Sequence, residues 1–202
     1  MIRREFLFSA AAFGVIGAVA WRHGNWLGLA PGAGPVSSPA TPVATDGKPT
    51  MVTIVKFSDA GQRLEKVSVP KVVKTDDEWR QILTANQFDI TRHADTEMAF
   101  SGEGYDRHDK GLYRCVCCAN ALYSSDTKYD SGTGWPSFWA PIAKENIVER
   151  SDSTYMMVRT EVTCRLCDAH LGHVFDDGPK PTGLRYCMNA AAMKFVPAAK
   201  GS

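Results

Sequence analysis

The sequence predicts a mainly β domain that is preceded by short helices and carries a metal site built from cysteines. From Gly111 onward, short runs with strand character alternate with turn signals. A helix start signal at Thr75 precedes them, and two Cys-x-x-Cys pairs follow with 45 residues between them. Apolar residues make up 44% of the 202-residue chain, which is enough to build one core.

Residues 1–30 have the composition of an export signal. Arg3 and Arg4 precede an almost uncharged run from Phe6 to Trp21, which is short for a membrane span of about 20 residues. The segment Arg-Arg-Glu-Phe-Leu resembles the twin-arginine signal, which would make the export machinery a partner. We therefore expect an exported chain, periplasmic or membrane-tethered facing the periplasm. Cleavage after Ala20 and retention as an anchor both remain open, and an ordinary hydrophobic helix is the alternative.

Residues 31–50 predict a flexible linker, because they are rich in Pro, Gly, Ala, Ser and Thr with almost no large apolar side chain. The folded domain is therefore expected at residues 51–202. With 23 basic and 22 acidic residues the net charge is +1, which argues against a nucleic-acid partner held by bulk charge.

The order of expected elements begins with two alternating runs, residues 52–57 and 64–69, which predict strands. Thr75-Asp-Asp-Glu78 is a capping box that opens a helix through Trp79 to Leu83, and a weaker pattern at 88–98 suggests a second short helix. The remaining strands are expected at residues 112–115, 121–125, 155–164, 185–189 and 192–196.

Two cysteine pairs, Cys115/Cys118 and Cys164/Cys167, have the spacing of zinc knuckles. Each knuckle presents two thiolates, and two knuckles complete the tetrahedral shell of one structural zinc ion. Because oxidising compartments favour disulfides, disulfide pairing is the alternative for an exported protein. A thioredoxin-type redox pair fits less well, since neither pair follows a strand-to-helix pattern.

If four cysteines bind zinc, Cys117 and Cys187 remain. Cys187 is the candidate nucleophile, because Cys117 lies inside a knuckle. Alternation along the strand at 185–189 puts Arg185, Cys187 and Asn189 on one face. An adjacent cation favours a thiolate, whereas an unassisted thiol has a pKa of about 8.5. The alternative is that Cys187 is a small buried apolar residue.

Five segments together resemble the B-type methionine sulfoxide reductases, which act on the R epimer of peptide-bound methionine sulfoxide. The resemblance runs from about Thr75 to Phe195. The segments are Phe100-Ser-Gly-Glu-Gly-Tyr, Gly111-Leu-Tyr-Arg-Cys-Val-Cys-Cys, Lys128-Tyr-Asp-Ser-Gly-Thr-Gly-Trp-Pro-Ser-Phe138, Ala169-His-Leu-Gly-His-Val-Phe-Asp-Asp-Gly178 and Gly183-Leu-Arg-Tyr-Cys-Met-Asn189.

The resemblance implies two antiparallel sheets in a β-tent-like arrangement and a structural zinc on the four knuckle cysteines. It implies substrates that are oxidised proteins or peptides, and a thioredoxin-like reductant or small thiol as partner. The family's catalytic cysteine falls on Cys187. Its substrate pocket falls on Trp135, His170, His173, Phe175, Asp177, Arg185 and Asn189.

The chemistry of the carried-over residues agrees with sulfoxide reduction. Cys187 would attack sulfur, and His173, with His170 or a water, would give a proton to the departing oxygen. Trp135 would form the wall for the S-methyl group. The two histidines would point to opposite faces of an unbroken strand, so we expect a bulge or turn at Gly172.

The ion pair expected between Asp177 and Arg185 has two interpretations, a part in the reaction or a purely orienting role.

One departure from the family concerns the resolving cysteine, which many members carry where this chain has Thr133. A sulfenic acid on Cys187 would normally condense with a second thiol. We therefore expect reduction by an external thiol or a thioredoxin-like protein. A smaller departure is Ala190, where members often have Ser.

Two other classes of function are compatible with parts of the sequence. A zinc-dependent hydrolase would use His170 and His173 as ligands, but it would need a second metal, because four cysteines saturate the first. A non-catalytic zinc-ribbon binding module would give Cys187 no role.

Overall fold

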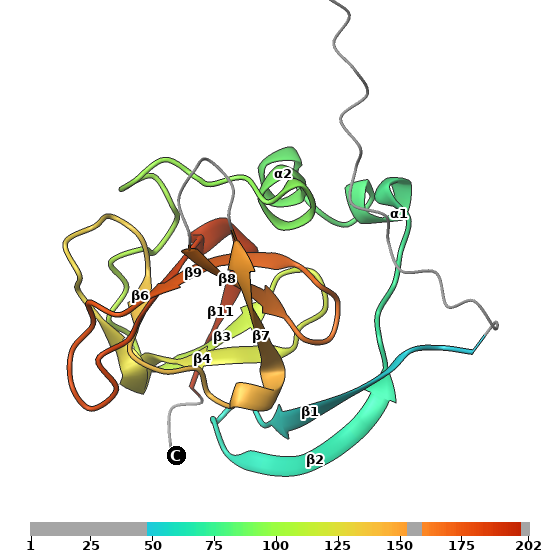
Figure 1. The fold of residues 1–202 in the computed structure, drawn as a ribbon, viewed down its shortest axis with the longest axis horizontal. Coiled ribbons are helices and arrows are strands. Elements are labelled where there is room, and N and C mark those ends of the chain that lie inside the picture. The colour runs from blue at the N-terminus through green and yellow to red at the C-terminus, as the bar shows by residue number, and fades with distance from the viewer. Residues whose placement is uncertain (1–47, 153–158, 199–202) are drawn as a thin grey trace, which may run out of the picture. The chain divides into compact units, whose positions relative to one another are not determined.

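The computed structural model describes residues 48–152 and 159–198, which form a mainly β unit (Figure 1). The prediction of a mainly β fold is confirmed. The expected export signal at 1–30 and residues 31–47 of the expected linker lie outside the described residues, as does the first part of the strand expected at 155–164. In the described part of the chain, no helix has the length and apolar character needed to cross a membrane.

An antiparallel hairpin of β1 (Met51–Phe57) and β2 (Arg63–Pro70) begins the described fold. Its second strand is largely exposed, whereas Val55 and Phe57 of β1 pack against Leu112, Ala121 and Ala143. The buried amide of Asn146 also attaches the hairpin to the rest of the unit. Its Oδ1 accepts from the Val55 N–H at 2.7 Å, and its Nδ2 donates to the carbonyls of Val55 and Ala121 at 2.9 and 2.7 Å.

The two helices, α1 (Asp76–Arg80) and α2 (Ala85–His93), are shorter or placed earlier than the sequence predicted. The Thr75 capping box is present, but α1 stops at Arg80 instead of reaching Leu83. A second capping box, Thr84 with Gln87, starts a new helix there. Figure 1 shows α1 and α2 on one side of the sheets, where Trp79 and Phe88 enter the core.

Two larger antiparallel sheets make up the rest of the unit. They are the two antiparallel sheets that the resemblance implied from about Thr75 to Phe195, and the β1–β2 hairpin before them is a third sheet among the described residues. The six-stranded sheet has the order β5-β6-β10-β9-β8-β7, and the three-stranded sheet has the order β11-β3-β4. The strands are β3 (Gly111–Cys115), β4 (Ala121–Ser124), β5 (Lys128–Tyr129), β6 (Ser137–Phe138), β7 (Ile147–Asp152), β8 (Arg159–Cys164), β9 (His170–Phe175), β10 (Arg185–Met188) and β11 (Met193–Pro197).

Within residues 48–152 and 159–198, three short 3-10 helices connect the strands: η1 (Ser125–Thr127), η2 (Lys144–Asn146) and η4 (Ala190–Ala192). The last of them directly follows β10 and Asn189, so it lies at the end of the strand that carries Cys187.

The core is aromatic, and it fixes the orientation of β10. The rings of Tyr123 and Phe138 stack at 4.4 Å, and the Tyr123 hydroxyl donates to the Met188 sulfur at 3.1 Å. Along β10, Tyr186 and Met188 are buried while Arg185 and Cys187 are partly exposed. The expected alternation is confirmed from Arg185 to Met188, and the packed face of β10 turns Cys187 toward the opposite side of the sheet. Asn189 follows the strand and is buried, so it does not continue the partly exposed pattern.

Candidate active site and metal centre

Cys187 lies in the middle of the six-stranded sheet, with a neighbour on each side. In the antiparallel register its partner on β9 is His173 and its partner on β6 is Ser137. Directly opposite residues in such ladders have Cβ atoms about 5 Å apart on the same face. The Thr133 hydroxyl is 3.9 Å from the Cys187 sulfur. The sheet therefore places a thiol, an imidazole and two hydroxyls on one face.

A bulge in β9 brings the two histidines together. Pairing with β8 shifts between Val162 opposite Gly172 and Thr163 opposite His170, so one extra residue is accommodated. The rings of His170 and His173 have centroids 5.4 Å apart. Gly172 has φ +151°, and a Cβ there would lie 2.2 Å from the Cys187 carbonyl oxygen. The predicted bulge is thus confirmed, and only glycine allows β9 and β10 to approach this closely.

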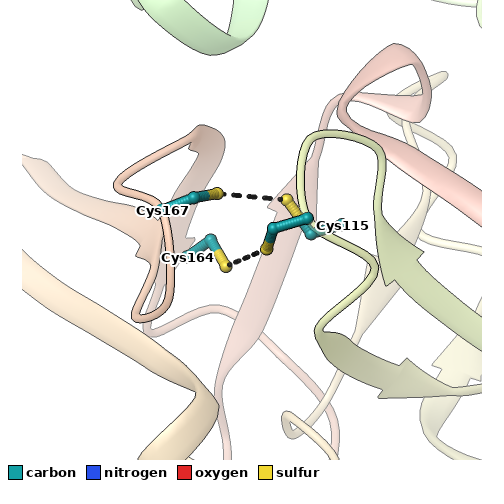
Figure 2. A group of neighbouring side chains, drawn as sticks. Cys115, Cys164 and Cys167 are labelled. Carbon is teal, nitrogen blue, oxygen red and sulfur yellow. Dashed lines mark hydrogen bonds between the residues drawn. The ribbon is translucent and has the colours of Figure 1, made fainter. Parts of the chain in front are cut away.

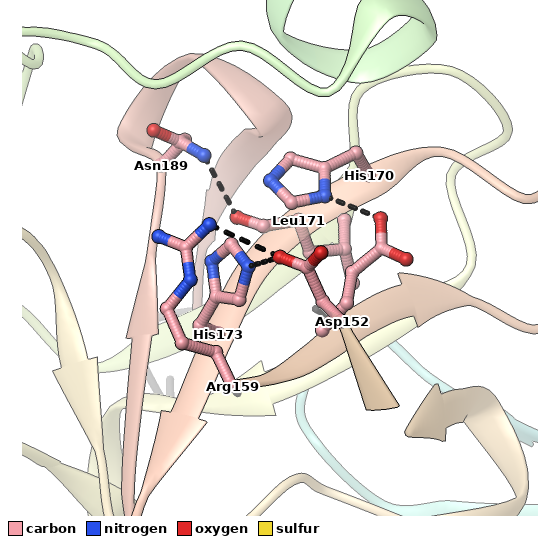
Figure 3. Close-up of polar contacts among 7 residues, drawn as sticks. Asp152, Arg159, His170, Leu171, His173 and Asn189 are labelled. Carbon is pink, nitrogen blue, oxygen red and sulfur yellow. Dashed lines mark hydrogen bonds and ion pairs between the residues drawn. The ribbon is translucent and has the colours of Figure 1, made fainter. Parts of the chain in front are cut away.

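Each histidine of β9 is held by a carboxylate from the same sheet, Glu161 on the adjacent strand β8 and Asp152 on the next strand β7 (Figure 3). His170 Nδ1 is 2.7 Å from the Glu161 carboxylate, and His173 Nε2 is 3.0 Å from Asp152, which also pairs with Arg159 at 3.0 Å. Because an ionised carboxylate only accepts, these ring nitrogens carry the protons. In the neutral rings the lone pairs are therefore at His170 Nε2 and His173 Nδ1.

The electrostatics distinguish the two imidazoles. Burial lowers the pKa of His173, and the hydrogen bond to Asp152 opposes that shift. His173 is consequently neutral at pH 7. The hydrogen bond from His170 lowers the pKa of Glu161, so Glu161 remains a carboxylate there. The Nε2 atom of His170 is buried and has no hydrogen-bond partner among the described residues, which makes it available to a bound molecule.

The Cys187 thiol differs from the sequence expectation of a thiolate. Burial raises its pKa, and this outweighs the opposing effects of Thr133, Arg185 and Ser137. The unliganded site therefore holds a thiol at neutral pH. The nearby cation lowers the pKa as the sequence predicted, but the loss of water around the sulfur raises it by more.

Arg185 is held by Asp177 and Phe175. Its guanidinium donates twice to the Asp177 carboxylate, each time at 2.8 Å, and lies 4.4 Å from the centre of the Phe175 ring. This hydrogen bonding lowers the pKa of Asp177 and raises that of Arg185. The predicted ion pair is therefore present, and its geometry fixes Arg185 beside Cys187.

Trp135 and Asn189 meet at a residue that the sequence argument did not select, Glu97. The indole N–H donates to the Glu97 carbonyl at 3.0 Å, and the Glu97 N–H donates to the Asn189 side-chain oxygen at 3.1 Å. The Glu97 carboxylate accepts from the N–H groups of Ala190 and Ala191. One buried residue thus links the predicted substrate wall to the end of β10.

The four knuckle cysteines form a separate cluster (Figure 2). Their sulfur atoms all lie within 4.8 Å of one another, and Cys115–Cys167 and Cys118–Cys164 are each 3.6 Å apart. Four thiolates at about 2.3 Å from one tetrahedral ion would be about 3.8 Å apart. The cysteines are free rather than disulfide-bonded, so the donor set fits a metal ion. In the part of the chain that the structure describes, no other group of three or more such side chains is arranged to hold a metal.

The sixth cysteine, Cys117, is buried beside this cluster. Its sulfur is 3.4 Å from the Thr91 hydroxyl on α2. It lies in the turn between β3 and β4, whereas Cys187 lies on β10 of the six-stranded sheet.

A cavity of about 640 Å³ among the described residues does not include Cys187. It is lined in part by Glu97, Pro136, Ala190 and Phe195.

Comparison with known proteins supports the resemblance to the B-type methionine sulfoxide reductases. The SelR domain model matches residues 83–197, which is more than half of the sequence. A peptide methionine sulfoxide reductase MsrB of Hahella chejuensis is 60% identical over 125 residues, covering 62% of this chain and 90% of the relative. The chain belongs to the MsrB family.

Two further MsrB proteins match over almost the same region. The protein of Herminiimonas arsenicoxydans is 56% identical, covering 62% of this chain and 91% of its own length. The protein of Pseudomonas aeruginosa is 54% identical, covering 63% and 96%. The β1–β2 hairpin lies before the SelR match begins.

The MsrB resemblance in the sequence did not identify the residues behind the pocket, namely Glu97, Asp152, Arg159 and Glu161. The signal for Glu161 was available: it stands three positions before Cys164 on the strand next to the histidines. Glu97 gave no signal, because its contacts depend on a loop that returns to η4.

Proposed function

We propose that this chain reduces the R epimer of peptide-bound methionine sulfoxide, with Cys187 as the nucleophile. As a member of the MsrB family, the chain is an oxidoreductase that acts on peptide methionine sulfoxide. The observation that carries the residue assignment is the register of β10, which sets Cys187 opposite His173 on a face bordered by Arg185. No comparable arrangement is needed for a binding module.

The proton balance of the reaction suits a neutral thiol. The Cys187 sulfur attacks the sulfoxide sulfur and forms an S–S bond to it. The oxygen then moves to the Cys187 sulfur while the S–S bond breaks, which leaves a thioether and a cysteine sulfenic acid, so the sulfoxide is reduced and the cysteine oxidised by two electrons. His173, neutral and with its proton on Nε2, accepts the thiol proton at Nδ1 and passes it to the oxygen, so no proton is gained or lost overall. His170 keeps its proton on Nδ1 toward Glu161, so its Nε2, which has no partner among the described residues, accepts a hydrogen bond from the protonated oxygen.

The substrate side chain would be positioned by the residues around Cys187. Trp135, fixed through its indole N–H, supplies an aromatic face for the S-methyl group. Asn189 has its amide oriented by Glu97 and by the Leu171 carbonyl at 3.3 Å. These hydrogen bonds set the pocket before substrate arrives, which reduces the ordering required on binding.

The metal of the four-cysteine cluster is proposed to be zinc, with Cys115, Cys118, Cys164 and Cys167 as its ligands. Four thiolates in tetrahedral arrangement are the donor set of structural zinc sites. A closed shell of this kind would supply stability to the fold and take no part in the reaction.

Regeneration is proposed to need an external thiol, such as a thioredoxin-like protein or a small thiol. Thr133 stands 3.9 Å from the Cys187 sulfur, where a second cysteine would resolve the sulfenic acid. Mass spectrometry after one equivalent of oxidised peptide, without reductant, should show a sulfenic acid or its labelled adduct on Cys187. An intramolecular Cys117–Cys187 disulfide in high yield would overturn this. Thr133→Cys is the matched variant, in which a 133–187 disulfide is expected.

The proposed activity is tested with the full chain, dithiothreitol and both epimers of a methionine sulfoxide peptide. We expect kcat/KM for the R epimer to be at least about a hundredfold higher than for the S epimer. Opposite chirality at sulfur would exchange the positions of the oxygen and the methyl group in the site. Equal turnover of both epimers, or no turnover of either, would contradict the proposal.

We also propose that the chain is exported by the twin-arginine route and acts in the periplasm, free or tethered. The support is the Arg3-Arg4-Glu-Phe-Leu segment followed by an apolar run. Cell fractionation should find wild type outside the cytoplasm and the Arg3→Lys/Arg4→Lys variant inside it. Wild type confined to the cytoplasm would refute the assignment.

A further inference from the structure

Two large apolar side chains beside Trp135 are held at the surface. Met98 is 79% exposed and Phe100 is 61% exposed, although the residue between Thr96 and Met98, Glu97, is buried. Isolated exposed apolar residues are common and need no explanation. These two differ because they stand in one turn that is fixed to the candidate active site.

The turn is rigidly bonded in itself. The N–H and the hydroxyl of Ser101 both donate to the Met98 carbonyl, at 3.2 and 2.7 Å. The Phe100 N–H donates to the Gly134 carbonyl at 2.8 Å. Exposure of Met98 and Phe100 is therefore a consequence of defined hydrogen bonding.

The turn is also joined to the residues that would bind the sulfoxide. Glu97, directly before Met98, accepts from the Trp135 indole and donates to Asn189. On the other side, the Phe100 ring packs against Gly134, where a Cβ would lie 2.8 Å from the ring. Gly134 is flanked by Thr133, which is 3.9 Å from the Cys187 sulfur, and by Trp135.

The backbone of Phe100 adopts an unfavourable conformation for its residue type. Its φ is +65°, a left-handed value that is uncommon for residues with a bulky side chain and readily adopted by Gly or Asn. The Phe100 ring meets the Tyr105 ring edge-on, with centroids 5.7 Å apart, but most of its surface stays exposed, so neither burial nor backbone preference accounts for a phenylalanine there. Backbone strain combined with an exposed apolar ring at a site is an observation that points to binding.

We infer that Met98 and Phe100 form an apolar docking surface for the substrate polypeptide, which contacts the residues next to the oxidised methionine. An extended chain advances about 3.3 Å per residue, so residues one or two positions from the sulfoxide lie within reach of this turn. The partner is accordingly a peptide segment with apolar side chains flanking its methionine, a composition found in unfolded proteins. This inference rests on the proposed function and specifies the substrate class of the same site.

The test compares two uncharged peptides of equal length with one central methionine-R-sulfoxide, flanked by leucines in one and by serines in the other. N-acetyl-methionine-R-sulfoxide serves as a substrate without flanks. For the wild-type full chain we expect a kcat/KM about fivefold higher for the leucine peptide, expressed in KM, since partial burial of two apolar side chains gives an effect of this order. In the Met98→Ser/Phe100→Asn variant the ratio between the two peptides should fall close to one.

Three comparisons make this result decisive. Met98→Ser alone changes a side chain that is 79% exposed, so it should lower the ratio about twofold without a folding defect. Leu64→Ser, at a residue of similar exposure (57%) on β2, should keep the wild-type ratio. Asparagine at position 100 tolerates the left-handed backbone, so the double variant removes the ring and leaves the turn intact.

The inference is overturned if the wild type treats both peptides equally, if the double variant keeps the ratio, or if it slows all three substrates by the same factor. Those outcomes leave the proposed function standing, provided that the wild type reduces N-acetyl-methionine-R-sulfoxide. Failure to reduce that small substrate would instead refute the proposed function, and the docking surface with it.

Discussion

The four-cysteine cluster and the Cys187 site use the same side chain in opposite ways. The four sulfur atoms of the cluster come from two local turns and lie within 4.8 Å of one another, so the neighbours of each thiol are the other three thiols. Cys187 stands alone on a strand, and its neighbours come from β6, β9 and the loop at Thr133. The comparison teaches that local spacing identifies a closed metal shell, whereas a reactive cysteine is identified by what several strands place around it.

Cys187→Ser is the strongest test of this difference between the two cysteine sites. We expect at least a thousandfold loss of kcat for sulfoxide reduction, because the hydroxyl is a poor nucleophile for sulfur. The metal content and the melting temperature should stay at wild-type values, since Cys187 contributes no ligand to the cluster. Activity retained within tenfold would show that another group attacks the sulfoxide.

Cys164→Ser should have the reverse profile. Cys164 is fully buried and lies 3.6 Å from Cys118, so the change removes one of four donors from the inside of the cluster. Because the binding free energy of a structural metal is folding free energy, we expect loss of metal and a melting temperature lower by roughly 10 °C or more. Metal analysis and thermal unfolding by circular dichroism check this. A stable, metal-free and fully active variant would contradict a structural role.

Glu161→Gln tests the support behind the histidines. Gln keeps an oxygen that accepts from His170 Nδ1 but removes the negative charge beside that ring. We expect kcat/KM to fall about tenfold, because a neutral partner on Nδ1 makes Nε2 a weaker acceptor for the protonated oxygen. Asp152→Asn is the matched variant at His173: it removes a carboxylate hydrogen bond that raises the pKa of His173, so the acidic limb of the pH profile should move to lower pH. Unchanged kcat/KM in the first variant and an unchanged pH profile in the second would assign the carboxylates to structure alone.

The smallest expected effect concerns the ionisation of Cys187. Because burial raises its pKa, the rate of alkylation by iodoacetamide should rise about tenfold for each unit between pH 7 and 9, without a plateau. Arg185→Gln removes a cation that lowers this pKa, so its rate at pH 8 should be slower by about threefold. Cys187→Ser gives the background labelling. A plateau below pH 8 would show a thiolate in the free enzyme.

Much of this site could be predicted from local patterns. The spacing of the knuckle cysteines predicted the four-cysteine cluster, and the alternation of residues predicted which side of β10 is partly exposed. The position of Gly172 between two histidines predicted the bulge in β9. Each of these depends on residues within a few positions of one another, where geometry follows directly from the chain.

The remainder depended on distant segments. The ends of α1 and α2 were misplaced, because Thr84 and Gln87 start a second capping box within a continuous helical pattern. Glu97 and Asp152 became functional candidates only when loops and strands far along the chain brought them to Asn189 and His173. The thiolate expectation was wrong because burial depends on the whole sheet, which no local pattern contains.

The amide of Asn146 has a consequence for the order in which the chain folds. This amide bonds to Val55, which lies 91 positions earlier in the chain. Leu112 of β3 pairs with Val196 of β11, near the other end of the domain. A chain that is synthesised from its N-terminus therefore cannot attach its first hairpin until Asn146 has emerged, and cannot complete the three-stranded sheet until Val196 has. The three-stranded sheet is therefore completed late in the synthesis of this domain, and until then the apolar side of β1, with Val55 and Phe57, lacks the residues that cover it in the folded unit.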